Sequence, residues 1–327
     1  MKIGIQLTKN KEKYQDLLSV LKLDLDSKNG LEFFHIGDDN DLKNQINDLD
    51  VLATYGISES VFSNKSDKLK WIHFGAAGIE QSLFSSILKS KTIITNASGV
   101  HANPVSEFAM GMILYLSKQF VGCEEFKKSG DWTQWELARK TIQLKGKIVG
   151  IIGFGDIGKA IAKKAKTFDM KVIATRRLQK KIEKKKIVDK LIPLSNLDYL
   201  LAESDYVVIA CPLTPLTMGM IGSNELAKMK SSAFIINIAR GAIIDESALI
   251  NSLQQKQITG AGLDVFSTEP LDKDSPLFEL DNIFLSPHIS GNFPEYQKDV
   301  VVQFTDNLNR FIASKELKNS VCKERLY

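Results

Sequence analysis

The sequence predicts an α/β protein with two domains, each built on a parallel β-sheet. A chain of 327 residues is too long for one ordinary core and suits two domains of roughly 100–200 residues each. Short apolar runs alternate with helical patterns along the chain, which is typical of βαβ units. Runs such as Tyr206–Ala210 are apolar on both faces, as expected of strands that helices cover on both sides.

The individual elements follow from these patterns. In the first hundred residues the strand candidates are Lys2–Leu7, Asp50–Tyr55, Leu69–Phe74 and Thr92–Asn96. Later candidates are Lys147–Gly153, Lys171–Arg176, Tyr206–Cys211, Ala233–Ala239, Ile258–Phe266 and Asn282–Ser286. We expect helices at Ser106–Phe120, with Ser106 as its cap, at Ile157–Thr167 and at Asp299–Ala313.

Composition excludes several classes of protein. Hydrophobic residues make up 43% of the chain and charged residues 25%, which is enough apolar material for sizeable cores. The net charge of +4 is too small for a general nucleic-acid surface, and no apolar run approaches the ~18 residues that span a bilayer. Cys123, Cys211 and Cys322 are far apart and lack metal-ligand spacing. We therefore expect a reduced, cytoplasmic protein that binds neither nucleic acid nor membrane.

A glycine turn, Gly153-Phe154-Gly155-Asp156-Ile157-Gly158, carries the strongest functional signal. A strand pattern leads into it and an amphipathic helix pattern follows, which is the order that dinucleotide binding requires. The first glycine permits the tight turn, the second lets the backbone approach a pyrophosphate, and the third lets helix and strand pack closely. The alternative is a turn of the same shape without a ligand. The context favours dinucleotide binding.

The next strand end bears on the choice of dinucleotide. An NAD enzyme usually places Asp or Glu there, whereas this chain continues from Thr175 into Arg176 and Arg177. A guanidinium can pair with the 2′-phosphate of NADP in a bidentate fork. The alternative is that segment 176–186 is only a solvated basic loop and helix start, as we expect of Lys184–Lys186. We predict NADP, with NAD possible.

Four polar residues stand at strand ends further along the chain: Arg240, Asp264, Glu269 and His288. Reduction of a 2-keto acid requires a cation for the carboxylate and carbonyl, and a proton donor for the developing alkoxide. An imidazolium is the natural donor near neutral pH, and a neighbouring carboxylate favours its charged form. Singly, each residue is more often a surface ion pair or polar packing. Together, behind a dinucleotide turn, Arg240, Glu269 and His288 indicate such a site.

At these residues the chain resembles the D-isomer-specific 2-hydroxyacid dehydrogenases. The resemblance is carried by segments 69–80, 96–108, 144–162, 211–222, 236–253, 262–270 and 285–291. It implies that Arg240 binds and polarises the 2-keto acid, that His288 is the general acid/base, and that Glu269 keeps His288 protonated. It also implies that Asp264 contacts the nicotinamide carboxamide and that the N–H groups around Ala77-Gly78 take the substrate carboxylate. Further cofactor contacts implied in this way are Pro212, Thr217, Ile238 and Gly291.

The resemblance further implies two flavodoxin-like domains and a homodimer formed through the cofactor domain. Residues 1–100 and 292–327 would form the substrate-binding domain, and residues 101–291 the dinucleotide-binding Rossmann domain inserted into it. Related formate dehydrogenases have Gln where this chain has Glu269, which argues against that activity. The tail has Cys322 where Asp is common, which puts only local tail contacts in doubt.

The sequence favours an NADPH-preferring glyoxylate/hydroxypyruvate-type reductase that acts on a small 2-keto or 2-hydroxy acid. One alternative is a phosphoglycerate dehydrogenase, which should need further cations for the phosphate; His73 is a candidate, but packing is an equal explanation. A second is a dinucleotide-sensing co-repressor-like binding module, although no partner-binding tail is evident. The candidates for setting substrate size are Trp132, Trp135, His101 and Tyr296.

Overall fold

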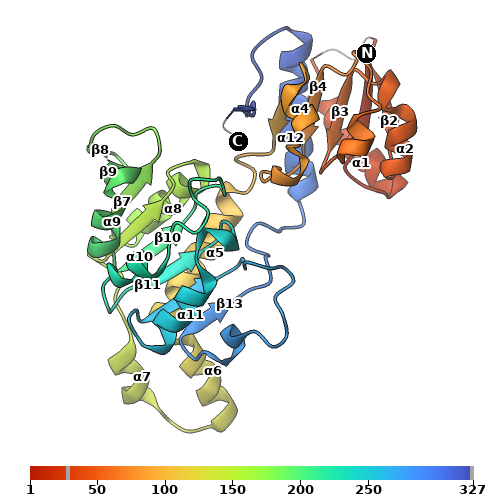
Figure 1. The fold of residues 1–327 in the computed structure, drawn as a ribbon. Coiled ribbons are helices and arrows are strands. Elements are labelled where there is room, and N and C mark those ends of the chain that lie inside the picture. Colours follow the sequence, from red (N-terminus) through yellow and green to blue (C-terminus); the bar gives the residue numbers. More distant parts are fainter. Residues whose placement is uncertain (27–29, 325–327) are drawn as a thin grey trace. The chain divides into compact units, whose positions relative to one another are not determined.

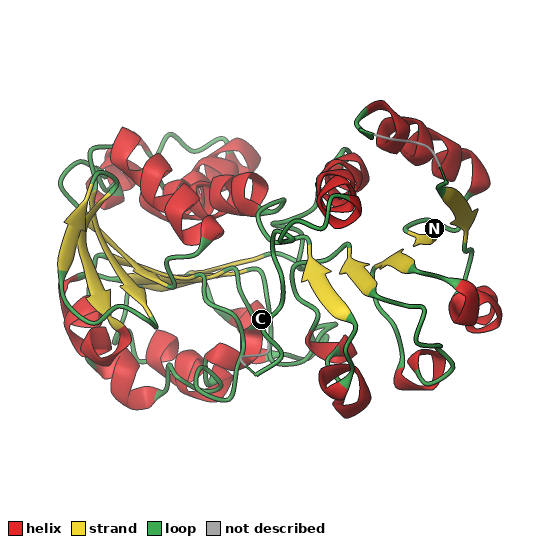
Figure 2. Ribbon diagram, turned by 90° about the horizontal axis from the view of Figure 1, so that it is seen from above, coloured by secondary structure: helices red, strands yellow, loops and turns green. Residues whose placement is uncertain are grey.

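The computed structural model describes residues 1–26 and 30–324 and divides the chain into two compact units. Unit 1 comprises Met1–His101 and Phe293–Tyr327, and unit 2 comprises Ala102–Asn292. Each unit has a largely parallel sheet with helices on both faces (Figures 1 and 2). The predicted fold class, two α/β domains with parallel sheets, is confirmed.

Unit 1 contains a five-stranded sheet in the order β2-β1-β3-β4-β5, with every neighbouring pair parallel. Its strands are β1 (Lys2–Gln6), β2 (Glu32–His35), β3 (Val51–Thr54), β4 (Trp71–Phe74) and β5 (Ile93–Asn96). All residues of β3 and β4 are buried, as the apolar runs predict for central strands. Helices α1 (Lys11–Leu23) and α12 (Tyr296–Ile312) pack on one face. The other face is covered by α2 (Asp39–Gln45), α3 (Glu59–Phe62) and α4 (Ser85–Lys89).

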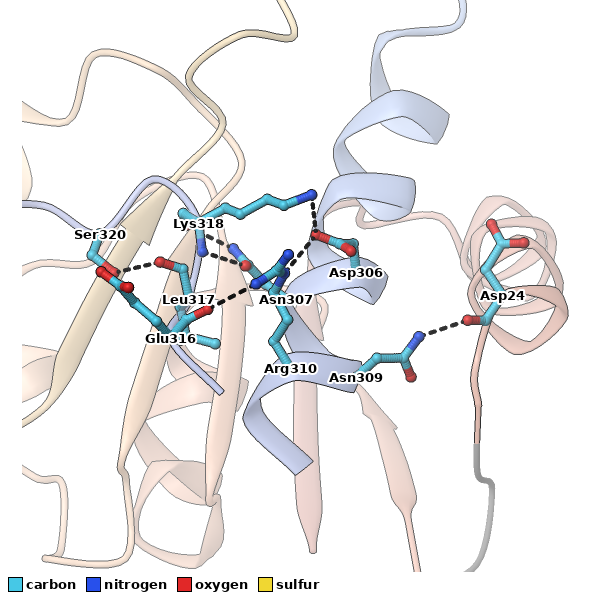
Figure 3. A network of polar contacts seen from close by, with 9 residues as sticks. All are labelled: Asp24, Asp306, Asn307, Asn309, Arg310, Glu316, Leu317, Lys318 and Ser320. Atoms are coloured by element: carbon cyan, nitrogen blue, oxygen red, sulfur yellow. Dashed lines mark hydrogen bonds and ion pairs between the residues drawn. The ribbon is translucent and has the colours of Figure 1, made fainter. Parts of the chain in front are cut away.

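A polar network holds the C-terminal tail on unit 1 (Figure 3). The Asp306 carboxylate on α12 accepts from Lys318 Nζ at 3.0 Å and from Arg310 Nε at 3.3 Å. The Asn307 side chain exchanges two hydrogen bonds with the backbone of Lys318, at 2.8 and 2.9 Å. The following residues run antiparallel beside β5, where Val321 N donates to Ile94 O at 2.8 Å. The tail thereby covers the exposed edge of this sheet.

Unit 2 contains an eight-stranded sheet in the order β13-β12-β11-β10-β6-β7-β9-β8, parallel except for β8 against β9. Its strands are β6 (Ile148–Ile152), β7 (Lys171–Arg176), β8 (Glu183–Lys185), β9 (Val188–Pro193), β10 (Tyr206–Ile209), β11 (Phe234–Asn237), β12 (Gly260–Leu263) and β13 (Ile283–Leu285). The strand order reverses between β6 and β10. Ligands of open α/β sheets bind at such a switch point, beyond the carboxyl ends of the strands.

Helices cover both faces of this sheet. On one face lie α5 (Ala102–Ser117) and α8 (Asp156–Thr167), and on the other α9 (Leu197–Glu203), α10 (Ser223–Ala227) and α11 (Glu246–Gln254). Helices α6 (Phe120–Ser129) and α7 (Gln134–Lys140) stand apart from both layers (Figure 1). In the described part of the chain, no helix combines the length and apolar character that a membrane span requires.

Two local predictions are wrong. Ser106 does not cap a helix, because α5 begins four residues earlier, with Pro104 in its first turn, and the buried Ser106 hydroxyl donates to Asn103 O at 2.8 Å. The basic segment after Arg176 contains no helix start: strand β8 forms a hairpin with β9. The segment forms a strand because it pairs with β9, and the pattern of charges in the sequence does not reveal this pairing.

Candidate active site

The glycine turn follows β6 directly, at the switch point of the unit 2 sheet. Gly153 has a φ of +104°, and a Cβ there would lie 2.7 Å from the carbonyl oxygen of Ala210. A Cβ on Gly158 would lie 2.1 Å from the carbonyl oxygen of Gly153, so the first turn of α8 packs directly on the strand end. A Cβ on Gly155 would meet no atom within 4 Å. The turn thus packs tightly where the fold needs it and is open where a phosphate would approach.

The start of α8 fits an anion. Gly155 is its N-cap and offers no side-chain acceptor to the first N–H groups of this 12-residue helix. Asp156 is exposed and pairs with Lys159 at 3.4 Å, while Phe154 and Ile157 pack against the core. Unsatisfied N–H groups and the helix dipole together favour a negatively charged group. These residues therefore fit the pyrophosphate of a dinucleotide.

The end of β7 lies beside this turn. The sheet register pairs Ile152 with Thr175, which places Arg176 at the same edge as Gly153. Thr175 is buried, and its hydroxyl accepts from Gly153 N at 3.4 Å. Arg176 and Arg177 are exposed at the strand end. Two guanidinium groups thus stand where the ribose end of a dinucleotide would lie.

The other expected cofactor contacts lie in loops at the same sheet. Thr217 is buried and closes its own turn, donating to Pro212 O at 2.7 Å and accepting from Thr214 N at 2.8 Å. Pro212 is exposed and Gly291 half-buried. Ile238 is 6% exposed and packs in the core on the α5 and α8 face. In the structure, Thr217 closes a turn and Ile238 packs in the core.

Arg240 sits in a turn that two other residues fix. The Asn237 side chain at the end of β11 donates to Arg240 O at 2.9 Å and accepts from Ala239 N at 3.1 Å. A Cβ on Gly241 would lie 1.9 Å from the carbonyl carbon of Phe266, which belongs to the loop after β12. The turn that carries Arg240 is therefore in direct backbone contact with the loop that carries Glu269.

His288 and Glu269 form a pair. The distance between His288 Nδ1 and Glu269 Oε2 is 2.7 Å, and the other carboxylate oxygen accepts from Phe266 N at 3.0 Å. The two side chains are 48% and 36% exposed, so the pair is open to a ligand. This bond leaves Nε2 as the imidazole nitrogen that can exchange a proton with a substrate. A base oriented by a carboxylate is the arrangement that general acid–base chemistry requires.

Asp264 holds the loop that carries His288. It is only 1% exposed, and its Oδ1 accepts from the Ser286 hydroxyl at 2.6 Å and from Ile289 N at 2.9 Å. Its Oδ2 accepts from Ser290 N at 2.9 Å. His288 itself has a φ of +51°, a left-handed conformation that these bonds stabilise. In the structure the Asp264 carboxylate is thus a support for this loop.

The expected carboxylate-binding residues lie in unit 1, in the loop after β4. Asn96 donates to Ala77 O at 2.9 Å, and Ala97 N donates to Ala76 O at 3.1 Å. Among the hydrogen bonds of the residues that the structure describes, none is donated by the amides of Ala76, Ala77 or Gly78. The loop therefore presents a series of N–H groups that an anion can use.

Sequence reasoning did not single out Asn237, Ser286 or Gly241. All three lie inside the quoted motifs, beside a residue that was chosen. The available signal was position: each is a small or polar residue at the end of a strand or a few residues beyond it, where a loop must be fixed. Of the substrate-size candidates, Trp132 and Trp135 are 76% and 71% exposed near α7, and His101 stacks on Tyr296 in unit 1.

Comparison with known proteins identifies the family. Residues 110–290, more than half of the chain, match the family model described as D-isomer specific 2-hydroxyacid dehydrogenase, NAD binding domain. The glyoxylate reductase of Thermococcus litoralis is 34% identical over 287 residues, covering 86% of this chain and 85% of that protein. The glyoxylate reductase of Pyrococcus furiosus is 34% identical over 278 residues, covering 83% and 81%. The chain belongs to the D-isomer-specific 2-hydroxyacid dehydrogenase family.

Solved structures agree on the fold. A D-isomer specific 2-hydroxyacid dehydrogenase family protein from Aeromonas salmonicida matches with a TM-score of 0.82 and 25% identity over 98% of this chain and 99% of that one. An NADPH-dependent glyoxylate/hydroxypyruvate reductase from Sinorhizobium meliloti, in complex with NADP and sulfate, matches with a TM-score of 0.84 and 22% identity over 100% and 99%. The protein is thus an NAD(P)-dependent oxidoreductase of small 2-keto and 2-hydroxy acids, as the sequence predicts.

Proposed function

We propose that this protein reduces glyoxylate or hydroxypyruvate to the corresponding 2-hydroxy acid, with NADPH as the preferred cofactor. The observation that carries the proposal is the His288–Glu269 pair at 2.7 Å, downstream of a glycine turn that fits a dinucleotide. The curated relatives named above are glyoxylate reductases, which favours a small substrate. In this proposal unit 2 holds the cofactor and unit 1 binds the substrate.

The residues have distinct tasks. A bound nicotinamide dinucleotide supplies the hydride. Arg240 binds the substrate carboxylate and polarises the carbonyl, and the N–H groups around Ala77-Gly78 take the same carboxylate. His288 donates the proton from Nε2 to the developing alkoxide, and Glu269 orients the imidazole through its contact with Nδ1. Asp264 keeps the His288 loop in the position that the transfer requires, beside its expected contact to the nicotinamide carboxamide.

The preference for NADPH is supported by the two arginines at the end of β7. Arg176 and Arg177 are exposed at the strand end where the ribose would lie, and the sequence from residue 171 to 182 contains no Asp or Glu that would repel a 2′-phosphate. The structurally similar glyoxylate/hydroxypyruvate reductase from Sinorhizobium meliloti is an NADPH-dependent enzyme. The double variant Arg176→Asp/Arg177→Ala is expected to shift the ratio of kcat/KM from NADPH towards NADH. An unchanged ratio would mean that the arginines are only solvated surface.

The activity is tested with a substrate panel and both cofactors. Purified protein is expected to oxidise NADPH, followed at its absorbance band, in the presence of glyoxylate or hydroxypyruvate. The matched control is His288→Gln, which keeps a polar side chain at the position but removes the proton donor. Failure of the wild-type protein to turn over any small 2-keto acid with either cofactor would refute the proposal.

A phosphoglycerate dehydrogenase activity is less well supported. The candidate cation was His73, but this side chain is fully buried in β4, with Nδ1 2.8 Å from the Thr95 hydroxyl. Burial lowers the pKa of His73 to about 3, so it is neutral and cannot bind a phosphate. To test this alternative directly, the substrate panel includes the phosphorylated 2-keto acid as a separate arm. The co-repressor reading has no specific observation in its favour.

We propose that the protein is a homodimer formed through α6 and α7. These helices pack on each other, since a Cβ on Gly122 would lie 2.3 Å from the Leu137 side chain, but they expose large apolar groups. Exposed fractions are 47% for Phe120, 76% for Trp132 and 71% for Trp135. Light scattering is expected to give a dimer for the wild type and a smaller species for Trp132→Ala/Trp135→Ala. The control is Phe278→Ala, which removes an aromatic group that is 58% exposed elsewhere in unit 2.

We also place the protein in the cytoplasm. Cys123 and Cys211 are free thiols, and a reducing compartment keeps such thiols reduced. Cell fractionation tests this location directly.

A further inference from the structure

Tyr296 occupies a central position at one end of the unit 1 sheet. It is the first residue of α12 and is half-buried among aromatic rings. Its ring stacks on His101 at a centroid distance of 4.6 Å and on Tyr55 at 6.4 Å, and Phe293 contacts it edge-on at 5.7 Å. His101 and Phe293 are the residues at which the chain leaves and re-enters unit 1. The stack therefore fixes the Tyr296 ring from three sides.

The Tyr296 hydroxyl has a defined target. It donates to the carbonyl oxygen of Gly75, the residue that links β4 to the loop with Ala77 and Gly78. Gly75 N donates in turn to Thr54 O at 2.8 Å, and a Cβ on Gly75 would lie 2.9 Å from the Tyr55 ring. The start of the loop is thus clamped between the end of β3 and Tyr296. Asn96 and Ala97 hold the following residues.

We propose that Tyr296 is a positioning residue for substrate binding: its hydroxyl fixes Gly75 so that the amides of Ala76, Ala77 and Gly78 converge on the substrate carboxylate. This inference rests on the proposed function, in which these amides take that carboxylate. Tyr296 lies more than 200 positions along the chain from the loop, and no motif for dinucleotide or keto-acid chemistry includes it. Only the fold brings it to Gly75.

The chemistry of the hydroxyl agrees with this role. Burial, with a contribution from Tyr55, raises the pKa of Tyr296 above its ordinary value, so the hydroxyl stays a donor throughout the working pH range. A phenylalanine at this position would keep the ring stack and lose only the bond to Gly75. The hydroxyl can therefore be separated experimentally from the packing of the ring.

The test compares Tyr296→Phe with Tyr14→Phe. Tyr14 lies on α1, is buried in unit 1, and contacts His35 in a tilted ring pair with a centroid distance of 4.7 Å, so its substitution removes a phenolic hydroxyl from the same unit without touching Gly75. Two quantities are measured on the full-length protein. Hydrogen exchange followed by mass spectrometry reports on the peptide that contains residues 75–78. Steady-state kinetics with glyoxylate and NADPH report KM and kcat separately.

For Tyr296→Phe we expect faster amide exchange in residues 75–78 and an increase of about 5- to 10-fold in the KM for glyoxylate, with kcat and the KM for NADPH nearly unchanged. Tyr14→Phe is expected to change none of these. Unchanged exchange in Tyr296→Phe, or faster exchange with an unchanged KM, would overturn the inference. Absence of turnover in the wild type would refute the proposed function instead, and the exchange measurement would still decide whether Tyr296 fixes the loop.

Discussion

The buried carboxylate of Asp264 gives the sharpest test of how this site is supported. In Asp264→Asn, the amide oxygen can still accept from the Ser286 hydroxyl and from Ile289 N. These two hydrogen bonds lose the negative charge that strengthens them, which weakens each by about 1 kcal/mol. The amide nitrogen of the new side chain then faces Ser290 N. Both groups are hydrogen-bond donors, so Ser290 N loses its acceptor, which lowers the free energy of unfolding by about 2 kcal/mol more. A neutral group recovers part of the cost of burial. We therefore expect a net loss of about 2–3 kcal/mol.

For a unit of this size that loss corresponds to a fall in Tm of roughly 4–12 °C, measurable by circular dichroism. Because His288 N donates to the backbone oxygen of Asp264, the displaced loop should also lower kcat by about 10- to 100-fold. The control is Asp205→Asn. Asp205 accepts from Ile148 N at 2.8 Å and from Lys230 at 3.1 Å, just before β10 and thus at the amino end of the strands. The Asp205→Asn variant should be less stable than the wild type but have the same kcat. Equal kcat in folded Asp264→Asn and wild type would refute the reasoning.

Three further changes have defined outcomes. Glu269→Gln leaves one acceptor oxygen where Glu269 has two, so either Phe266 N or His288 Nδ1 loses its partner and kcat for reduction should fall by at least about 10-fold; an unchanged kcat argues against the role of this pair. Gly241→Ala places a Cβ 1.9 Å from the carbonyl carbon of Phe266, and the urea midpoint should report a loss of about 2–3 kcal/mol. For Asp306, burial alone would raise the pKa, but its bonded cations lower it overall. Its contribution is thus complete above the unfolded value of about 3.9 and is lost as the pH falls through the lower folded value, so Asp306→Asn should lower Tm slightly at pH 7, and this difference from wild type should shrink as the pH is lowered below about 3.9.

The strand pattern could be predicted where strands are buried on both faces. Runs such as Tyr206–Ile209 and Val51–Thr54 are continuous and apolar, and each is a central strand in the structure. The strands that the sequence did not indicate are β2, β8 and β9, which lie at or next to sheet edges. The residues of β2 and β8 are half-exposed or charged, and in β9 the charged Asp189 and Lys190 interrupt the buried apolar residues, so no continuous apolar run distinguishes these strands from loops. Their conformation depends on pairing with a neighbour that lies elsewhere in the sequence.

The site could be predicted as far as residue type and order along the chain determine it. The sequence predicts His288 and Glu269 as a proton donor with a neighbouring carboxylate, and in the structure His288 Nδ1 lies 2.7 Å from Glu269 Oε2. For Asp264 the resemblance implies a contact with the nicotinamide carboxamide, and the structure shows a second task that the sequence did not indicate: its carboxylate accepts from the loop of residues 286–290. The sequence shows that a carboxylate lies at the end of a strand, but it does not show which N–H groups donate to that carboxylate. That distinction depends on the path of a loop.

The loops that carry Arg240, Glu269 and His288 are joined to one another through backbone. Gly241 packs on the backbone of Phe266, Phe266 N donates to Glu269, and His288 N donates to the backbone of Asp264 two residues before Phe266. The side chains of Arg240 and His288 take no part in these contacts, and Glu269 uses only Oε1, which leaves Oε2 for His288. The three groups can therefore face a ligand while the carboxyl ends of β11, β12 and β13 hold their relative positions. A substitution at a joint should then change kcat through geometry even where the catalytic groups are all present, which is why Asp264 and Gly241 are more informative targets than the exposed residues around them.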